Sequence, residues 1–524
     1  MKRKLHLFWL LAFAGLFFAG CQKDNIVEID PMAVEDTDDD VNNTTFTQFV
    51  DIVFSTNGNA TVDGTNDDFT VSVSGNCVTL VYTGDEYVMY TLSGTASDGY
   101  FKLYRVRRQA ITLQGLTLTN PNGAALNIQG TVAEPNRGKR TFVILNGENT
   151  LADGTSYSQT PDGEDEKAAF FSEGQLIFSG DGSLTVNASG KSGIVSDDYV
   201  TVNGGDLNIT VTSSAYYDET DAEYKSPAGI KANDYVKMQS GKLTIASSGT
   251  GAKGISCDGN GYFNGGTTEV TVTGSNYGNS GGGGGFPGGG SSSSDGKSAK
   301  AIKCDGNLFF SGGQVVARSN SHEAIEAKGT ISITGGKVFG YSSSDDAINS
   351  GGDFTISGGY IVGCATSNDG LDANGNFYIK GGVVYAIGTS SPEVALDANT
   401  EGGYKLYVEG GTLIAIGGLE QGSSLTQSCY QASSWSQNTW YALTVGNSTY
   451  AFKSPSSGGT PLVVSGSSTP TLQSGVTVTD GTTCFADWLV ENPTVSGGTT
   501  VSLSSYSGGN GGGGGPGGGG HGPF

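Results

Sequence analysis

Residues 347–364 (AINSGGDFTISGGYIVGC) and residues 370–388 (GLDANGNFYIKGGVVYAIG) share one pattern: a short apolar step, a polar turn, an alternating strand, a glycine doublet and another strand. The second glycine of the doublet recurs in steps of 23 residues, at Gly313, Gly336, Gly359 and Gly382. A fixed period of this kind indicates stacked units that bury their apolar faces against one another. Three short strands fill one unit and leave no room for a helix. The sequence therefore predicts an all-β fold, a parallel β-helix.

Composition and charge agree with this class and exclude several functions. Glycine supplies 86 of 524 residues, about 16% against a usual share of about 7%. The net charge of -24, from 27 basic and 51 acidic residues, argues against a nucleic-acid partner, because phosphate backbones are bound through clustered Lys and Arg. Three histidines are too few for imidazole-rich zinc sites or Ser-His-Asp triads. We expect His322 to be a loop or surface residue.

The first 45 residues predict export and anchoring. Residues 1–20 have a basic start, a short apolar run and small residues before Cys21, which is typical of a signal peptide. The segment FAGC resembles a lipobox, so Cys21 is the expected lipidation site; an ordinary cleaved signal with an incidental cysteine is the alternative. Residues 21–45 form an acidic tether. These features predict an outer-membrane lipoprotein held by a lipid anchor, with exposure at the cell surface as an open alternative.

The remaining chain divides by its periodicity. We expect these segments: 46–109 as an N-terminal β cap, 110–418 as the β-helix with a glycine-rich loop at 276–296, 419–507 as a C-terminal β module, and 508–524 as a disordered glycine-rich tail. One outward column of the β-helix is apolar, like the inward columns: Val316, Phe339, Val362, Tyr385 and Ile414. Strands that are apolar on both faces are usually covered. We expect the C-terminal module or a terminal segment to cover the column, and an exposed binding stripe is the alternative.

Six cysteines remain after Cys21. Cys257 and Cys304 fall in one inward column on adjacent coils if the glycine-rich loop is an excursion. That spacing permits a disulfide, although we favour a buried thiol stack. Cys429 and Cys484 are the other plausible pair.

Acidic and amide side chains recur at one corner of successive coils. Stacking brings equivalent residues within about 5 Å, so their carboxylates repel one another unless a cation lies between them. Calcium suits such a site because it accepts many oxygen ligands in irregular geometry. The candidate calcium ligands are Asp345, Asp346, Asn349, Asp369, Asp372, Asn374, Asp397 and Asn399. Solvated acid on turns is the alternative.

Aromatic residues mark a second candidate site. Tyr262, Phe309, Tyr378 and Tyr407 share the outward position of the strand before the doublet. Sugar rings stack on such faces, so these four are candidate ligand-binding residues.

Several strings resemble bacterial carbohydrate-binding β-helix proteins related to pectate lyases. They run from about 114 to 418 and include LQGLTLTNPNGAAL, ILNGENTLADGTSY and GLDANGNFYIKGG. The resemblance implies a right-handed parallel β-helix that binds calcium and acidic or cellulosic plant polysaccharides without established cleavage. The family's acidic corner, D-G-I-D-x-N-G, matches residues 369–375, whereas Ser192, Lys253 and Lys300 replace its first Asp in earlier coils.

These observations favour a surface-anchored, non-catalytic protein that binds polysaccharide with the help of calcium. A calcium-dependent lyase is an alternative, because Lys300, Lys303 and Arg318 are conceivable bases for β-elimination. A structural or adhesive surface protein is the third hypothesis.

Overall fold

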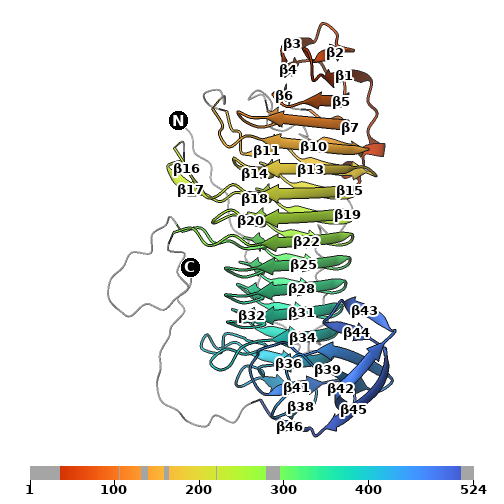
Figure 1. Cartoon of the computed structure of the whole chain (residues 1–524), viewed down its shortest axis with the longest axis vertical. Coiled ribbons are helices and arrows are strands. Elements are labelled where there is room, and N and C mark those ends of the chain that lie inside the picture. Colours follow the sequence, from red (N-terminus) through yellow and green to blue (C-terminus); the bar gives the residue numbers. More distant parts are fainter. Residues whose placement is uncertain are drawn as a thin grey trace, which may run out of the picture.

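The computed structural model describes residues 36–105, 107–130, 140–158, 164–219, 221–278 and 296–508. Within these ranges the chain is all-β, with two 3-10 turns, η2 (Thr37–Asp39) and η3 (Val41–Asn43), as its helical elements. Figure 1 shows a tall stack of strands with a separate sheet packed against its C-terminal end. The signal peptide, Cys21, most of the tether, nearly all of the glycine-rich loop and nearly all of the tail lie outside the described residues.

Each 23-residue unit contributes three strands, as the coil from β29 (Ile348–Ser350) through β30 (Phe354–Ile356) to β31 (Tyr360–Ala365) illustrates. All three pair in parallel with the next coil, so that Ile348 lies beside Leu371 and Phe354 beside Phe377. The second doublet glycine turns the chain between the second and third strands. Gly359, for example, has φ +84°, a conformation that side chains with a Cβ rarely adopt.

The first strands of the coils form one 12-stranded sheet. We call it the first-strand sheet; it is parallel except at β3. Its strands are β3 (Phe69–Ser74), β4 (Asn76–Tyr82), β6 (Gly99–Tyr104), β8 (Leu126–Gln129), β11 (Ala168–Ser172), β14 (Ser192–Ser196), β18 (Ala228–Ala232), β20 (Lys253–Cys257), β23 (Ile302–Cys304), β26 (Ile325–Ala327), β29 and β32 (Leu371–Ala373).

The second and third strands form two further parallel ladders. The second ladder begins with β1 (Gln48–Phe54). In several N-terminal coils the second and third strands are fused into one long strand: β5 (Val88–Ala96), β7 (Gln109–Asn120), β15 (Val200–Val211) and β19 (Val236–Ser247). The second ladder continues through β9 (Thr141–Asn146), β12 (Leu176–Gly180), β21 (Gly261–Phe263), β24 (Leu308–Phe310), β27 (Ile331–Ile333), β30, β33 (Phe377–Ile379), β35 (Leu406–Val408) and β37 (Ser424–Leu425). The third contains β10 (Glu148–Asp153), β13 (Ser183–Ala188), β22 (Thr267–Val272), β25 (Gln314–Ser319), β28 (Lys337–Ser342), β31, β34 (Val383–Ile387) and β36 (Thr412–Ile416).

Parallel pairing begins before residue 110, inside the segment expected to be a cap. β1 pairs in parallel with β5 and β4 with β6, while β2 (Thr61–Asp63) and β3 add antiparallel edges. The steps between paired positions are uneven here: Gln48 and Val88 are 40 residues apart, whereas Val88 and Gln109 are 21 apart. This unevenness hides the repeat. A hairpin of β16 (Tyr216–Asp218) and β17 (Glu223–Lys225) extends from the side of the stack.

The C-terminal module covers the apolar outward column, as predicted. Its strands are β38 (Cys429–Ala432), β39 (Trp440–Val445), β40 (Ser448–Lys453), β41 (Leu462–Ser465), β42 (Thr471–Thr479), β43 (Thr482–Phe485), β44 (Leu489–Glu491), β45 (Thr494–Val501) and β46 (Ser504–Tyr506). Val362, Tyr385 and Ile414 share one buried cluster with Leu443 and Phe452 of this module. β41 also pairs with β36 in antiparallel fashion and covers the edge of the last coil.

The expectation of a buried thiol stack was wrong, because Cys257 and Cys304 form a disulfide. The two residues are direct partners in the parallel pairing of β20 and β23, which places their Cα atoms 4.7 Å apart. Cys429 and Cys484, the other pair considered, are both free and buried.

Among the described residues, no helix is long and apolar enough to cross a membrane.

Candidate functional site

Carboxylates from successive coils meet at the outer face of the first-strand sheet. We call six residues the acidic column: Asp346, Asn349, Asp369, Asp372, Asp397 and Glu420. The pairing of β29 with β32 places Asn349 beside Asp372. The Asn349 amide donates from Nδ2 to Asp346 Oδ2 at 3.0 Å and to Asp372 Oδ2 at 2.9 Å. One amide therefore links carboxylates of two coils.

The carboxylates of the acidic column are poorly hydrated and close to like charges. Asp346 is 6% exposed and Asp369 7% exposed. Burial and the neighbouring carboxylates raise the pKa of Asp346 to about 8 and that of Asp369 to about 9. The same causes raise the pKa of Asp372 well above its ordinary value. Within the described part of the chain, no Lys, Arg or His forms an ion pair with these acids. Protonation or a bound cation would relieve the repulsion.

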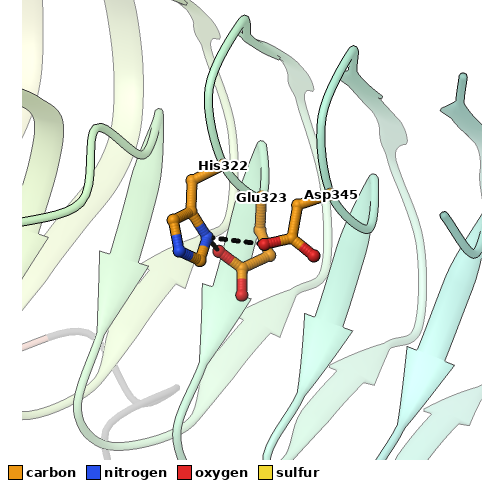
Figure 2. A group of neighbouring side chains, drawn as sticks. All are labelled: His322, Glu323 and Asp345. Carbon is orange, nitrogen blue, oxygen red and sulfur yellow. Dashed lines mark hydrogen bonds and ion pairs between the residues drawn. The ribbon is translucent and has the colours of Figure 1, made fainter. Parts of the chain in front are cut away.

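The preceding coils hold acids at equivalent positions, but there the charges are neutralised. Lys300 Nζ lies 3.0 Å from Glu323 Oε2 and 2.6 Å from Glu326 Oε2. Figure 2 shows the His322 ring facing the carboxylates of Glu323 and Asp345, with Nδ1 bonded to Glu323 and 2.9 Å from Asp345 Oδ2. The acidic column therefore begins on the coil that follows Lys300 and His322.

His322 lies in the loop between β25 and β26, which confirms the expectation of a loop residue, and it also pairs with two carboxylates. Its ring is half-buried, and although burial disfavours the imidazolium, the carboxylates of Asp345 and Glu323 outweigh burial and raise its pKa to about 9. The three side chains are close enough to hold a metal ion. The protonated imidazole has no lone pair for a metal, so in this state the group is an ion-pair cluster. Sequence reasoning missed it because Asp345 lies on the next coil.

Glu420 is the member of the acidic column that sequence reasoning missed. It lies 23 residues after Asp397, and the bridge between Leu396 and Leu419 extends the first-strand position to it. Burial and a hydrogen bond with Asp397 raise its pKa to about 8. The 23-residue step could have found it, but the β-helix was expected to end at residue 418.

Asn374 and Asn399, two further candidate ligands, bind backbone at the following turn. Asn374 Nδ2 donates to the Ser350 carbonyl at 3.3 Å, and Asn399 Oδ1 accepts from the Gly402 amide at 2.8 Å. In this structure both side chains hold the turn between the first and second strands.

The candidate aromatic residues occupy a different sheet, on the second ladder. Tyr262 stacks on Phe309 with ring centroids 5.2 Å apart, and Tyr378 stacks on Tyr407 at 5.0 Å. The two pairs are separated by two coils that carry Ser332 and Thr355 at the same position, and they do not meet the acidic column. Tyr262 is 2% exposed, whereas the other three rings are half-buried, so they offer more surface to a ligand.

Comparison with known proteins assigns the family. A family model described as "Carbohydrate-binding domain-containing protein" matches residues 74–370, more than half of the chain. The chain belongs to this family. The matched region includes Asp346 and Asp369 and ends just before Asp372.

Two known proteins are similar to parts of this chain. A protein of the same description from Acetivibrio thermocellus is 30% identical over 127 residues, which cover 24% of this chain and 42% of the relative. The match thus spans less than half of the relative's length. A solved structure, described as that of the polysaccharide lyase-like protein from C. thermocellum in a gadolinium derivative, has 19% sequence identity and a TM-score of 0.34. That similarity covers 60% of this chain and 96% of the solved one.

Proposed function

We propose that the protein binds polysaccharide with the help of calcium, without cleaving it, on the outer surface of a right-handed parallel β-helix. Membership of the carbohydrate-binding domain family supports the ligand class. The observation that carries the proposal is the acidic column, where carboxylates of successive coils converge with no neighbouring cation among the described residues.

Asp346, Asn349, Asp369 and Asp372 are the residues that would hold calcium, with Asp397 on the next coil. Calcium takes six to eight oxygen ligands and tolerates irregular geometry, which fits carboxylates mixed with an amide. Asn349 now points its Nδ2 at both Asp346 and Asp372. Rotation of the Asn349 side-chain amide would direct Oδ1, instead of the Nδ2 donor, towards the cation.

Calcium held this way would also bind the glycan. A protein site rarely supplies every oxygen, so open coordination positions can take a hydroxyl or a carboxylate of a sugar. An acidic glycan would gain the most affinity from the calcium, because its own negative charge helps to neutralise the cation. A cellulosic glycan would depend on stacking against aromatic rings instead. The exposed edges of Phe309, Tyr378 and Tyr407 are the proposed stacking surfaces.

Anchoring is part of the proposal and depends on the sequence alone. The leader of residues 1–20 and the lipobox-like segment before Cys21 support an outer-membrane lipoprotein that displays the β-helix at the cell surface.

Binding is favoured over lyase activity by the state of the conceivable bases. Burial disfavours the Lys300 ammonium, but its contacts with Glu323 and Glu326 outweigh burial and raise its pKa, which makes it a poor proton acceptor. Lys303 is paired with Asp305. The Arg318 guanidinium lies over the Phe339 ring, with 4.9 Å between its central carbon and the ring centroid. A residue that abstracts the uronate proton needs a free basic lone pair. The ion pairs engage the amino groups of Lys300 and Lys303. Burial lowers the pKa of Arg318, but a guanidinium stays protonated in proteins and offers no such lone pair.

The test measures calcium and glycan binding by the same variants. We expect titration calorimetry to show calcium binding to the wild type, and Asp372→Asn to weaken it at least tenfold. Asp258→Asn, which changes an exposed acid in the turn after β20, is the matched control and should leave binding unchanged. Retention on polygalacturonate should fall with chelator and with Asp372→Asn. Calcium-independent retention on polygalacturonate, or an unsaturated uronate product, would contradict the proposal.

A further inference from the structure

A polar cavity lies at the end of the first-strand sheet opposite the acidic column. Its strands β4, β6 and β8 belong to the N-terminal coils, which Figure 1 shows. It has a volume of about 140 Å³, and its walls include Thr79, Tyr100, Lys102, Tyr104, Asn127 and Glu166. Thr79, Lys102 and Asn127 are direct neighbours across β4, β6 and β8, so they share one outward column. Seven strand steps separate β8 from β29, which places this cavity roughly 34 Å from the acidic column.

The polar groups of the cavity are buried and held in position. Lys102 is 6% exposed and pairs with Glu164 and with Glu166, whose Oε1 lies 3.6 Å from Nζ. Asn127 donates from Nδ2 to Glu166 Oε1 at 2.7 Å, and its Oδ1 accepts from Gln129 Nε2 at 2.7 Å. Side chains fixed in this way lose little freedom when a ligand binds, which makes the cavity a preorganised site.

Aromatic and amide groups give the cavity the chemistry of a sugar site. Tyr100 and Tyr104 flank Lys102 on the same face of β6, and Lys102 Nζ lies 5.4 Å from the Tyr104 ring centroid. Asn120 and Asn122, at the end of β7 and in the following turn, complete the wall with further amides. An aromatic ring receives the C–H face of a sugar, while ammonium, amide and carboxylate groups match adjacent hydroxyls, which both donate and accept.

The charge of the cavity selects the kind of sugar. Lys102 faces two carboxylates, Glu164 and Glu166, so the group carries a net negative charge when all three are ionised. A uronate carboxylate would be repelled, and no calcium is needed to bind hydroxyl groups here. The volume suits one ring, which favours a chain end or a branch.

We propose that this cavity is a second, calcium-independent subsite that binds one neutral sugar unit of the glycan. The inference rests on the proposed function, because it assumes that the protein binds carbohydrate. It assigns neutral sugar to one end of the first-strand sheet and calcium-dependent binding to the other.

Gly123 offers a variant that disturbs the cavity without removing a lining side chain. A Cβ at this position would lie 2.7 Å from Glu166 Oε2, so Gly123→Ala would displace that carboxylate. Tyr100→Ala removes a ring, and Tyr100→Phe keeps it. Tyr217→Ala, which removes an exposed ring on the β16–β17 hairpin, is the matched control.

The experiment titrates the full chain with neutral oligosaccharides, cellotriose and a galactose trisaccharide, in chelator, and with polygalacturonate in calcium. We expect Tyr100→Ala and Gly123→Ala to weaken neutral-sugar binding at least tenfold, with unchanged melting temperatures. Tyr100→Phe, Tyr217→Ala and Asp372→Asn should bind neutral sugar as the wild type does. The subsite is overturned if these oligosaccharides do not bind while polygalacturonate still does, or if both cavity variants bind them normally. Failure of every glycan, with or without calcium, would overturn the proposed function as well.

Discussion

A single buried lysine shows how strongly position within the stack controls chemistry. Lys253 is 9% exposed, and its Nζ donates to Ser226 Oγ at 2.7 Å. Burial and the nearby lysines, Lys303 and Lys300 first among them, lower its pKa to about 7. The sequence showed that Lys253 replaces the first Asp of the acidic-corner motif. The pKa of Lys253, however, depends on lysines of neighbouring coils, whose proximity is known only from the stacked structure.

Lys253→Met should alter the pH dependence of stability. Between about pH 7 and 10 the unfolded chain holds a proton at Lys253 that the native state lacks, so wild-type stability should rise with pH by up to about 1.4 kcal/mol per unit from this group. Below pH 7 both states are protonated and the native state bears the full cost of a buried charge. The variant should therefore melt higher than the wild type at pH 6, and the difference should shrink towards pH 10. Denaturant unfolding at several pH values measures this, and a pH-independent difference would contradict it.

Asp369→Asn should change the protein in opposite directions with and without calcium. The raised pKa of Asp369 means that native stability falls as pH rises from about 4 towards 9, because the native state retains a proton that the unfolded state releases. An amide carries no such cost and still accepts from the Val394 amide, so the variant should melt several degrees higher in chelator at pH 7. Calcium should stabilise the wild type by about 2.7 kcal/mol at one hundred times its Kd and the variant by less. Equal calcium shifts in both proteins would contradict the ligand assignment.

The regular coils are the elements that the sequence predicted best. The 23-residue step placed Phe354 beside Phe377 and Asn349 beside Asp372, because parallel register follows directly from a constant period. The N-terminal coils were not recognised, since the steps between their paired positions are uneven. The ion-pair cluster of His322, Glu323 and Asp345 was also hidden, because turns set the orientation of side chains that register alone does not fix.

The disulfide between β20 and β23 should contribute substantially to stability. It closes a span of 47 residues, for which the loss of unfolded-state entropy corresponds to about 4 kcal/mol. Cys257→Ser, or a reducing agent applied to the wild type, should lower the melting temperature. Cys364→Ser, which removes a free buried thiol, tests whether any effect is due to losing a core sulfur. Identical melting with and without reductant would show that the bond adds nothing.

Across the whole molecule, one outward column of the first-strand sheet changes character from end to end. It begins with the polar cavity, passes apolar Phe171 and Val195 and then Lys231 and Lys303, and ends in the acidic column. The inward columns hold apolar residues and small buried ones, among them Ser196 and Ser350. The stack therefore acts as a uniform scaffold on which each coil can carry different chemistry without disturbing the core.

The C-terminal module is needed because it covers the apolar outward column of the last coils. Leu443→Asp tests this role. Leu443 is fully buried in the cluster that covers Val362 and Tyr385, and Tyr385 donates a hydrogen bond to the Lys453 carbonyl at 2.8 Å. A carboxylate at position 443 would be buried without a partner, which should destabilise the module by several kcal/mol and expose the apolar column. Thr444→Asp, on the half-buried opposite face of β39, should cost less than about 1 kcal/mol. Thermal unfolding with light scattering should show early melting and self-association for Leu443→Asp, and a monomeric variant of wild-type stability would mean that the column needs no cover.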